Sequence, residues 1–180
     1  FKSSEDIQKL ALYFASVKPS SHKWRDLCIF SIGCNIGLRG GDLLSRKWGD
    51  ILQNGQIRDG VIIYEEKTDK KRKFHLNQDC KDAIYLYLDN TYQDISTVDI
   101  DNYIFPSRKG GFITVRAYGK ILKQAAKEVG IEYNVGTHSM RKTFGYNIYK
   151  NTNNIELVQK MFGHSNSNIT LRYIGIDDEM

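Results

Sequence analysis

The spacing of apolar residues limits how this chain can fold more than any other feature, because it departs from the helical period in only one stretch of the sequence. Over residues 48–76 the run 61–64 (VIIY) is short and β-branched, residues 69–71 suit a turn, and residues 72–76 alternate polar with apolar. Elsewhere the apolar residues recur at helical spacing. The pattern predicts an α+β fold that is mainly helical and contains one small antiparallel sheet.

Two helices are expected before the sheet. Ser3 or Ser4 can cap the first, which has acidic residues in its first turn, and Pro19 with the serines after it breaks the pattern. The second runs from Trp24 to the helix stop at Gly37 and is apolar enough to be buried.

Four helices are expected after the sheet, each between a capping residue and a stop. They run from Asn77 through Leu88, from Thr114 to Val129, from Thr137 to about Lys150, and from Asn153 or Asn154 to Phe162. Residues 90–102 are polar and predict a loop. Because no repeat or low-complexity linker divides the chain, we expect residues 1–180 to form a single domain.

Composition narrows the possible partners without choosing one. The net charge of +5 and a pI near 9.0 favour a polyanion, although many basic domains bind no nucleic acid. The three cysteines are odd in number and lack C-x-x-C spacing, so we expect buried free thiols, no metal and no cofactor, in a reducing cytoplasm. No apolar run approaches the roughly 18 residues of a membrane helix, so no membrane partner is expected.

Arg39 is the first candidate for function. It lies directly after the predicted helix stop, in the segment GLRGGDLL (residues 37–44). Glycines let the backbone approach a ligand, and a guanidinium can hold a phosphate in a bidentate fork. A surface arginine paired with Asp42 is the alternative, and the segment alone does not decide between the two.

Lys67 is the second candidate, in the charged run EKTDKKRK (residues 66–73) on the predicted hairpin. Such cations can reach the edge of a nucleic-acid groove while one lysine is presented to a reacting oxygen. A run of charges is more often a solvated turn, so this motif also needs support from elsewhere.

The remaining candidates lie in the last third of the chain. The segment THSMR (residues 137–141) puts His138 and Arg141 on one face near a helix start, where the helix dipole favours an anion. A lone pair of this kind is more often a capping-region histidine beside an unrelated arginine. His164 follows in FGH (residues 162–164), and Tyr173 is one of eleven tyrosines, so its selection depends on the other candidates.

In chain order, the motifs G-L-R-x-x-D, K-T, H-x-x-R, G-H and Y resemble the catalytic signature of the tyrosine recombinases, also called phage integrases. The resemblance covers nearly the whole chain and includes the segment YIFPS (residues 103–107). Asp42 stands where the family often has glutamate, and Met140 replaces the commoner leucine, a change of similar volume.

The resemblance implies a fold, a set of site residues and partners. The fold is the tyrosine recombinase catalytic fold, a small antiparallel sheet packed on a helical bundle. The site residues are the phosphate-clamping arginines Arg39 and Arg141, the hairpin lysine Lys67, the histidines His138 and His164, and the nucleophile Tyr173. The partner is double-stranded DNA, bound by a homotetramer that can be monomeric in isolation, and the family's usual N-terminal core-binding domain is expected to be absent from this chain.

The implied chemistry is site-specific recombination through a covalent 3′-phosphotyrosine, for integration or excision of a phage or transposon. Arg39, Arg141 and His164 would stabilise the charge on phosphorus in the transition state. The same cations and His138 as proton acceptor would favour the phenolate, and Lys67 would protonate the departing 5′ oxygen.

Three other interpretations remain open at this point. A type IB topoisomerase uses a similar constellation to relax supercoils. Resolution of chromosome dimers is a second role for the same chemistry. A DNA-binding module without chemistry would need the cations, but it would not need Tyr173 and two histidines in this order.

Overall fold

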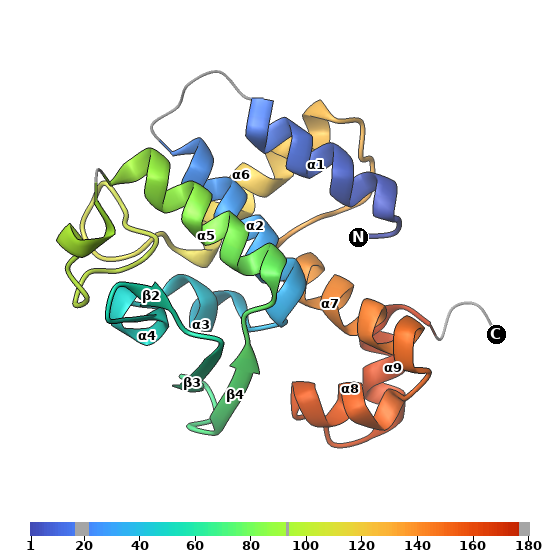
Figure 1. Cartoon of the computed structure of the whole chain (residues 1–180). Coiled ribbons are helices and arrows are strands. Elements are labelled where there is room, and N and C mark those ends of the chain that lie inside the picture. The colour runs from blue at the N-terminus through green and yellow to red at the C-terminus, as the bar shows by residue number, and fades with distance from the viewer. Residues whose placement is uncertain (17–21, 93, 177–180) are drawn as a thin grey trace.

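The structure is a computed structural model of the 180-residue chain, and it describes residues 1–16, 22–92 and 94–176. Its helices are α1 (Ser4–Ser16), α2 (Lys23–Ile36), α3 (Gly40–Leu44), α4 (Trp48–Ile51), α5 (Gln78–Thr91), α6 (Val115–Glu128), α7 (Thr137–Thr152), α8 (Ile155–Phe162) and α9 (Ser167–Ile174), with a 3-10 helix at Ile95–Thr97. Its strands are β1 (Leu52–Gln53), β2 (Gln56–Ile57), β3 (Gly60–Tyr64) and β4 (Lys71–His75). The predicted α+β, mainly helical fold is confirmed (Figure 1).

Helix α2 lies at the centre of the larger helical body, in contact with α1, α5 and α7 (Figure 1). It is buried around most of its circumference, as its apolar sequence predicts. At Gly33 it approaches α7 so closely that a Cβ there would lie 2.6 Å from Sδ of Met140. The helix ends at Gly37, whose φ of 62° is left-handed. This close crossing brings the start of α7 against the end of α2.

The strands form two separate two-stranded sheets, whereas one sheet was expected. The predicted hairpin is β3 and β4, paired antiparallel from Gly60 opposite His75 to Tyr64 opposite Lys71. The unpredicted pair is β1 and β2, joined at Asn54 and Gly55, which both have positive φ. Its strands are only two residues long, too short to show an alternating pattern.

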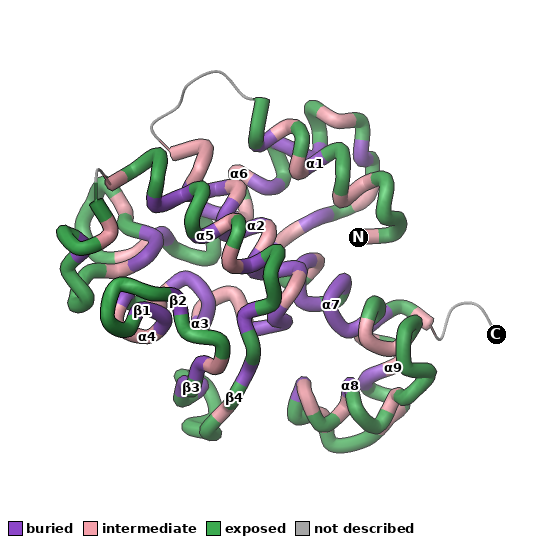
Figure 2. The backbone as a smooth tube through the Cα atoms, in the orientation of Figure 1, coloured by how far each residue is buried: buried purple, intermediate pink, exposed green. Residues whose placement is uncertain are grey.

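The apolar core has two parts, and Figure 2 shows which stretches of the backbone are buried. The larger part lies among α1 to α7 and the hairpins, and Trp48, Tyr118 and Phe105 are among its fully buried side chains. The smaller part joins α7, α8 and α9 and consists of Phe144, Val158, Phe162 and Ile174. Helices α8 and α9 are therefore held to the body mainly through α7, and in Figure 1 they project on the same side as the β3–β4 hairpin.

The helix boundaries agree with the sequence at most ends. Asn77, Thr114 and Asn154 cap their helices with side-chain oxygens, as predicted. Thr137 was expected to be a cap but is the first helical residue, because Gly136 occupies the capping position. The expected break at Pro19 lies outside the described residues.

Two further boundaries differ from the predictions. Helix α9 was not predicted at all, although Asn166 caps it and Gly175 ends it. Helix α5 runs two residues into the predicted polar loop, which also contains the 3-10 helix. In the described part of the chain, no helix has the length and apolar character needed to cross a membrane.

Candidate active site

Arg39 lies where the chain turns from α2 into α3. Its backbone is extended, with φ −63° and ψ 146°, and it directly precedes the short α3. The next residue, Gly40, packs tightly on the start of α7, since a Cβ there would lie 3.1 Å from Thr137. The turn therefore sets Arg39 beside the first residues of α7, about a hundred positions further along the chain.

Arg141 is buried on α7, with only 3% of its surface exposed. Its Nη1 donates to the carbonyl of Gly37 at 2.5 Å and its Nη2 to the carbonyl of Phe162 at 3.2 Å. Its guanidinium also lies 4.3 Å from the centre of the Phe162 ring. Burial, and then the nearby Arg72, lower the pKa of Arg141 to about 10, so it is charged at neutral pH. Arg141 thus joins the end of α2 to the end of α8.

Tyr173, on α9, is half-buried and lies against His138 from α7. The phenolic oxygen is 3.3 Å from Nδ1 of His138. The ring packs edge-on against Phe162 and His164, with centroid distances of 5.5 and 5.3 Å. Burial raises the pKa of Tyr173, and the positive charges of Arg141 and Arg39 only partly offset this. The cations were expected to favour the phenolate, but here burial outweighs them, so the phenol needs a proton acceptor.

His164 follows the helix stop Gly163, whose φ of 69° turns the chain out of α8. Its Nδ1 is hydrogen-bonded to the hydroxyl of Thr170 at 3.0 Å. Burial lowers the pKa of His164, and the charges of Arg141 and Arg39 lower it further. The second effect means that the imidazole lies close enough to both arginines to feel their charge.

Lys67 is exposed in the turn between β3 and β4. Among the residues that the structure describes, no hydrogen bond or ion pair joins it to the other five candidates. The structure therefore brings together Arg39, His138, Arg141, His164 and Tyr173 from four different elements and leaves Lys67 on a neighbouring turn. The grouping of the five is a fact of the geometry, whereas their catalytic roles remain a prediction.

Glu65 and its ion-pair partner Arg72 were not predicted as residues of this region. Glu65 is 6% exposed, and its carboxylate accepts from Nη1 of Arg39 at 2.5 Å and from Nη1 of Arg72 at 2.9 Å. The expected alternative pairing of Arg39 with Asp42 is wrong, because Asp42 accepts from the backbone N–H of Glu66 instead. A signal for Glu65 was present in the sequence. It continues the inward-facing alternation of Val61 and Ile63, and a carboxylate at an inward position needs a partner.

Within residues 1–16, 22–92 and 94–176, no three His, Cys, Asp or Glu side chains are grouped so that they could hold a metal ion. All three cysteines are buried and free, as expected. What the region presents is a group of guanidinium and imidazole donors beside one phenol. Such a group suits an oxyanion that accepts several hydrogen bonds, such as the non-bridging oxygens of a phosphodiester.

Comparison with known proteins identifies the family of this chain. The model of the Phage integrase family matches residues 3–180. The chain is 34% identical over 180 residues to the probable integrase/recombinase YoeC of Bacillus subtilis, covering 99% of this chain and 90% of that protein. It is 28% identical over 170 residues to the tyrosine recombinase XerD of Listeria monocytogenes, covering 94% of this chain and 55% of that protein. The chain thus spans about half the length of several tyrosine recombinases that it matches.

Solved structures resemble the fold closely. The XerA recombinase superposes with a TM-score of 0.76 at 22% identity, over 99% of this chain and 60% of that one. The catalytic domain of bacteriophage HP1 integrase superposes with a TM-score of 0.62 at 19% identity, over 98% of this chain and 87% of that one. The predicted catalytic fold is confirmed by these likenesses.

Proposed function

This chain belongs to the phage integrase family, and on that premise we propose that it cleaves and rejoins DNA at specific sites with Tyr173 as the nucleophile. The observation that carries the proposal is the placement of the Tyr173 phenol, 3.3 Å from Nδ1 of His138 and within the field of Arg141 and Arg39. A nucleophile within hydrogen-bond reach of a base, beside fixed positive charge, is the arrangement that phosphoryl transfer needs.

In the proposed first step, the phenolic oxygen attacks the scissile phosphorus and His138 takes the phenolic proton. The bond from phosphorus to the 5′ oxygen breaks, and Lys67 donates a proton to that oxygen. The products are a 3′-phosphotyrosine and a free 5′ hydroxyl. Because the phosphodiester energy is kept in the covalent bond, a 5′ hydroxyl from another strand can reverse the reaction without ATP.

The arginines supply charge where the transition state gains it. Arg141 uses two of its five N–H donors on backbone carbonyls, and a further donor faces the phenol of Tyr173, which leaves donors for phosphate oxygens. Because those two carbonyls hold the guanidinium, it needs little reorganisation during the reaction. Nδ1 of His164 is bonded to the Thr170 hydroxyl, so Nε2 is the ring nitrogen that can donate to a phosphate oxygen when it carries a proton.

Tyr173 needs a proton acceptor before it can attack phosphorus. A phenol is a poor nucleophile at neutral pH, and burial raises the pKa of Tyr173 further. His138 is exposed on the first turn of α7, and its Nδ1 lies within hydrogen-bond reach of the phenol. We therefore assign it as the base.

The partner in this proposal is double-stranded DNA. The net charge of +5 suits a polyanion, and among the similar structures XerH is solved with its difH substrate and the Tn1549 integrase with circular intermediate DNA. We infer that residues 1–180 form one catalytic domain that assembles as a homotetramer on DNA and can be monomeric without it. Integration or excision of a phage or transposon is the role we favour.

A nicked DNA duplex tests the proposal. The short strand beyond the nick diffuses away after cleavage, so a covalent adduct accumulates and is seen on a denaturing gel. Duplexes drawn from the DNA that flanks the gene serve as substrates. We expect an adduct with the unaltered protein and none with Tyr173→Phe, which keeps its DNA affinity. An adduct of undiminished yield from Tyr173→Phe would refute the assignment.

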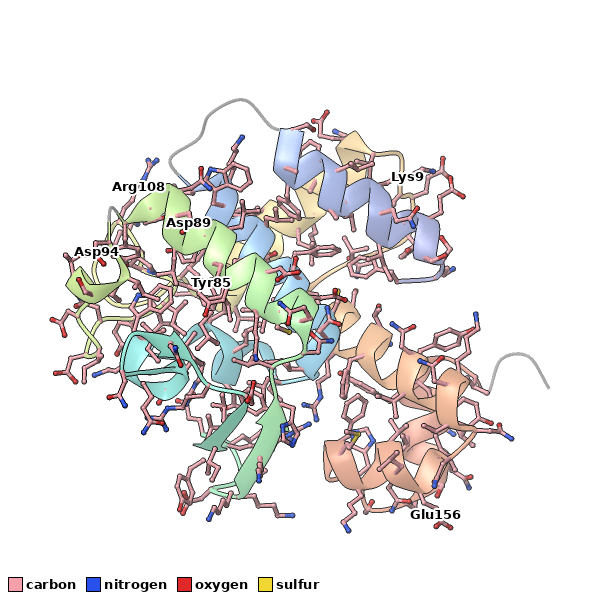
Figure 3. All side chains as sticks on the ribbon, in the orientation of Figure 1. Lys9, Tyr85, Asp89, Asp94, Arg108 and Glu156 are labelled. Carbon is pink, nitrogen blue, oxygen red and sulfur yellow. The ribbon has the colours of Figure 1, made fainter. Side chains whose placement is uncertain are left out.

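The same assay tests the other roles. We expect Lys67→Ala to lower cleavage by about a hundredfold, the typical contribution of a general acid. The control variant is Lys9→Ala, which also removes one positive charge. Lys9 is on α1, far from the hairpin in Figure 3, so the rate should be unchanged. Relaxation of a supercoiled plasmid without strand exchange between two sites would indicate topoisomerase activity instead. Full cleavage by His138→Ala would contradict its role as the base, and DNA binding by the unaltered protein without any adduct would favour a binding module.

A further inference from the structure

Glu65 is the buried carboxylate at the centre of the region, and the proposed mechanism gives it no role. It directly follows β3, and its side chain is 7% exposed. Three donors from three segments meet it, namely Arg39 at 2.5 Å, Arg72 at 2.9 Å and Thr68 at 2.8 Å. One oxygen is shared by Arg39 and Thr68, so the start of α3 and the hairpin turn are joined through a single atom.

The carboxylate is charged under all ordinary conditions. Burial acts to raise its pKa, but the hydrogen bonds from Thr68, Arg72 and Arg39 together lower it to about 2. A group that never takes up a proton near neutral pH cannot serve as an acid or a base there. Glu65 must therefore act through the groups that it holds.

The backbone of Glu65 also closes the turn that carries Lys67. Its N–H donates to the carbonyl of Lys70 at 3.0 Å, and its carbonyl accepts from Asp69 at 2.8 Å. In the sequence, Lys67 thus lies between Glu65 and Thr68, whose side chains are joined by a hydrogen bond. Any movement of the turn relative to Arg39 has to break this bond or the ion pair.

The carboxylate also separates like charges. Arg72 contributes to lowering the pKa of Arg141, so the two guanidiniums repel each other across the site. With Arg39, three guanidiniums face one region, and Glu65 pairs with two of them. Without it, the two paired guanidiniums would swing toward solvent or away from each other.

We propose that Glu65 is a positioning residue that fastens the Lys67 turn to Arg39, so that the proton donor and the phosphate clamp are held as one unit. This inference depends on the proposed function, because it assigns Glu65 to the reaction of Tyr173. It also makes a distinct claim, namely that loss of Glu65 impairs protonation of the leaving oxygen.

The leaving group can be changed to test that claim. In a nicked duplex with sulfur in place of the bridging 5′ oxygen, cleavage releases a thiolate, which needs no proton. We expect Glu65→Gln to slow cleavage of the ordinary duplex by about tenfold or more, part of the full effect of a general acid. The sulfur duplex should recover most of that loss, as it should for Lys67→Ala. DNA affinity should stay close to that of the unaltered protein.

Two further variants keep the result interpretable. Glu66→Gln removes the same charge one residue along, from an exposed side chain, and should cleave both duplexes at the normal rate. Thr68→Val removes only the hydroxyl from an exposed position, so it should fold normally even if Glu65→Gln does not. It should show the same recovery on sulfur with a loss of about fivefold, the effect of one hydrogen bond.

Each other outcome counts against the proposal. An equal loss on both duplexes would mean that Glu65 acts through the arginines or the fold alone, and an increase in cleavage would mean that it blocks the phosphate site. Normal rates for Glu65→Gln and Thr68→Val would also overturn it. The proposed function fails separately, when the unaltered protein gives no adduct at Tyr173 on either duplex.

Discussion

Replacing Phe162 by alanine should loosen α8 and α9, so that Tyr173 is no longer held in place beside the other site residues. Phe162 is 1% exposed, and its ring contacts those of Phe144, His164 and Tyr173 as well as the guanidinium of Arg141. It belongs to the small apolar cluster of α7, α8 and α9, whose buried side chains in the described part of the chain are Phe144, Val158, Phe162 and Ile174. One aromatic ring is therefore a large part of what holds α8 and α9 in place.

The expected cost follows from this burial. Truncation of a buried phenylalanine lowers the free energy of unfolding by about 3–5 kcal/mol. If that cost fell on the whole 180-residue chain, Tm would fall by about 10 °C. Because the small cluster is separate from the main core, we expect much of it to appear as local opening of α8 and α9. A displacement of about 1 Å at Tyr173 is enough to slow adduct formation by about a hundredfold.

Hydrogen exchange and the nicked-duplex assay measure the two effects. Amides of α8 and α9 should exchange much faster in Phe162→Ala, while those of α2 should change little. The matched control is Phe105→Ala, a fully buried ring of the main core that stacks on Tyr87. It should lower Tm comparably but leave cleavage by the folded protein unchanged. Equal acceleration of exchange in α2 and α9, or normal cleavage by Phe162→Ala, would refute this reasoning.

Three further predictions concern single residues. Arg141→Lys keeps the charge but cannot donate to the carbonyls of Gly37 and Phe162 together, so single-turnover cleavage should fall by about a hundredfold, and a rate within threefold of normal would contradict this. Gly37→Ala forces a Cβ to 2.1 Å from Cδ1 of Phe144 at a φ of 62°, and should lower the free energy of unfolding in urea by about 1–3 kcal/mol or more. Glu65 has a pKa of about 2 in the folded chain against an ordinary 4.5, so its charge stabilises the fold above pH 4.5 and this contribution is lost as the pH falls to about 2. The Tm difference between Glu65→Gln and the unaltered protein should therefore be largest near pH 7 and shrink below pH 4.5, and a constant difference would count against the ion pairs.

The helical framework could be predicted because its signals are local. Asn77, Thr114 and Asn154 are caps whose side chains bond within three residues, and Gly37 and Gly163 are stops that need left-handed backbone. Helix α9 was missed although its cap and stop have the same chemistry. It has only eight residues, so its apolar period is too brief to stand out.

The candidate site residues came from the order of the motifs, whereas their geometry could not be predicted. The order of the motifs selects Arg39, Arg141 and Tyr173, yet nothing local shows that Arg141 reaches the carbonyl of a residue 104 positions earlier. Such contacts depend on how α2 and α7 cross, which is decided by packing at Gly33. The ion pairs of Glu65 depend in the same way on where the hairpin meets α3. The alternation along β3 indicated that Glu65 is buried, but it did not indicate which cations it meets.

The residue that becomes linked to DNA is the most direct test of the proposed chemistry. After cleavage of a nicked duplex and nuclease digestion, the adduct leaves a nucleotide on one peptide, which mass spectrometry identifies. Cleavage after Lys160 or Arg172 yields a C-terminal peptide whose only tyrosine is Tyr173. We predict that this peptide carries the nucleotide on the phenolic oxygen of Tyr173. A nucleotide on any other residue, or an adduct that persists in Tyr173→Phe, would contradict the assignment.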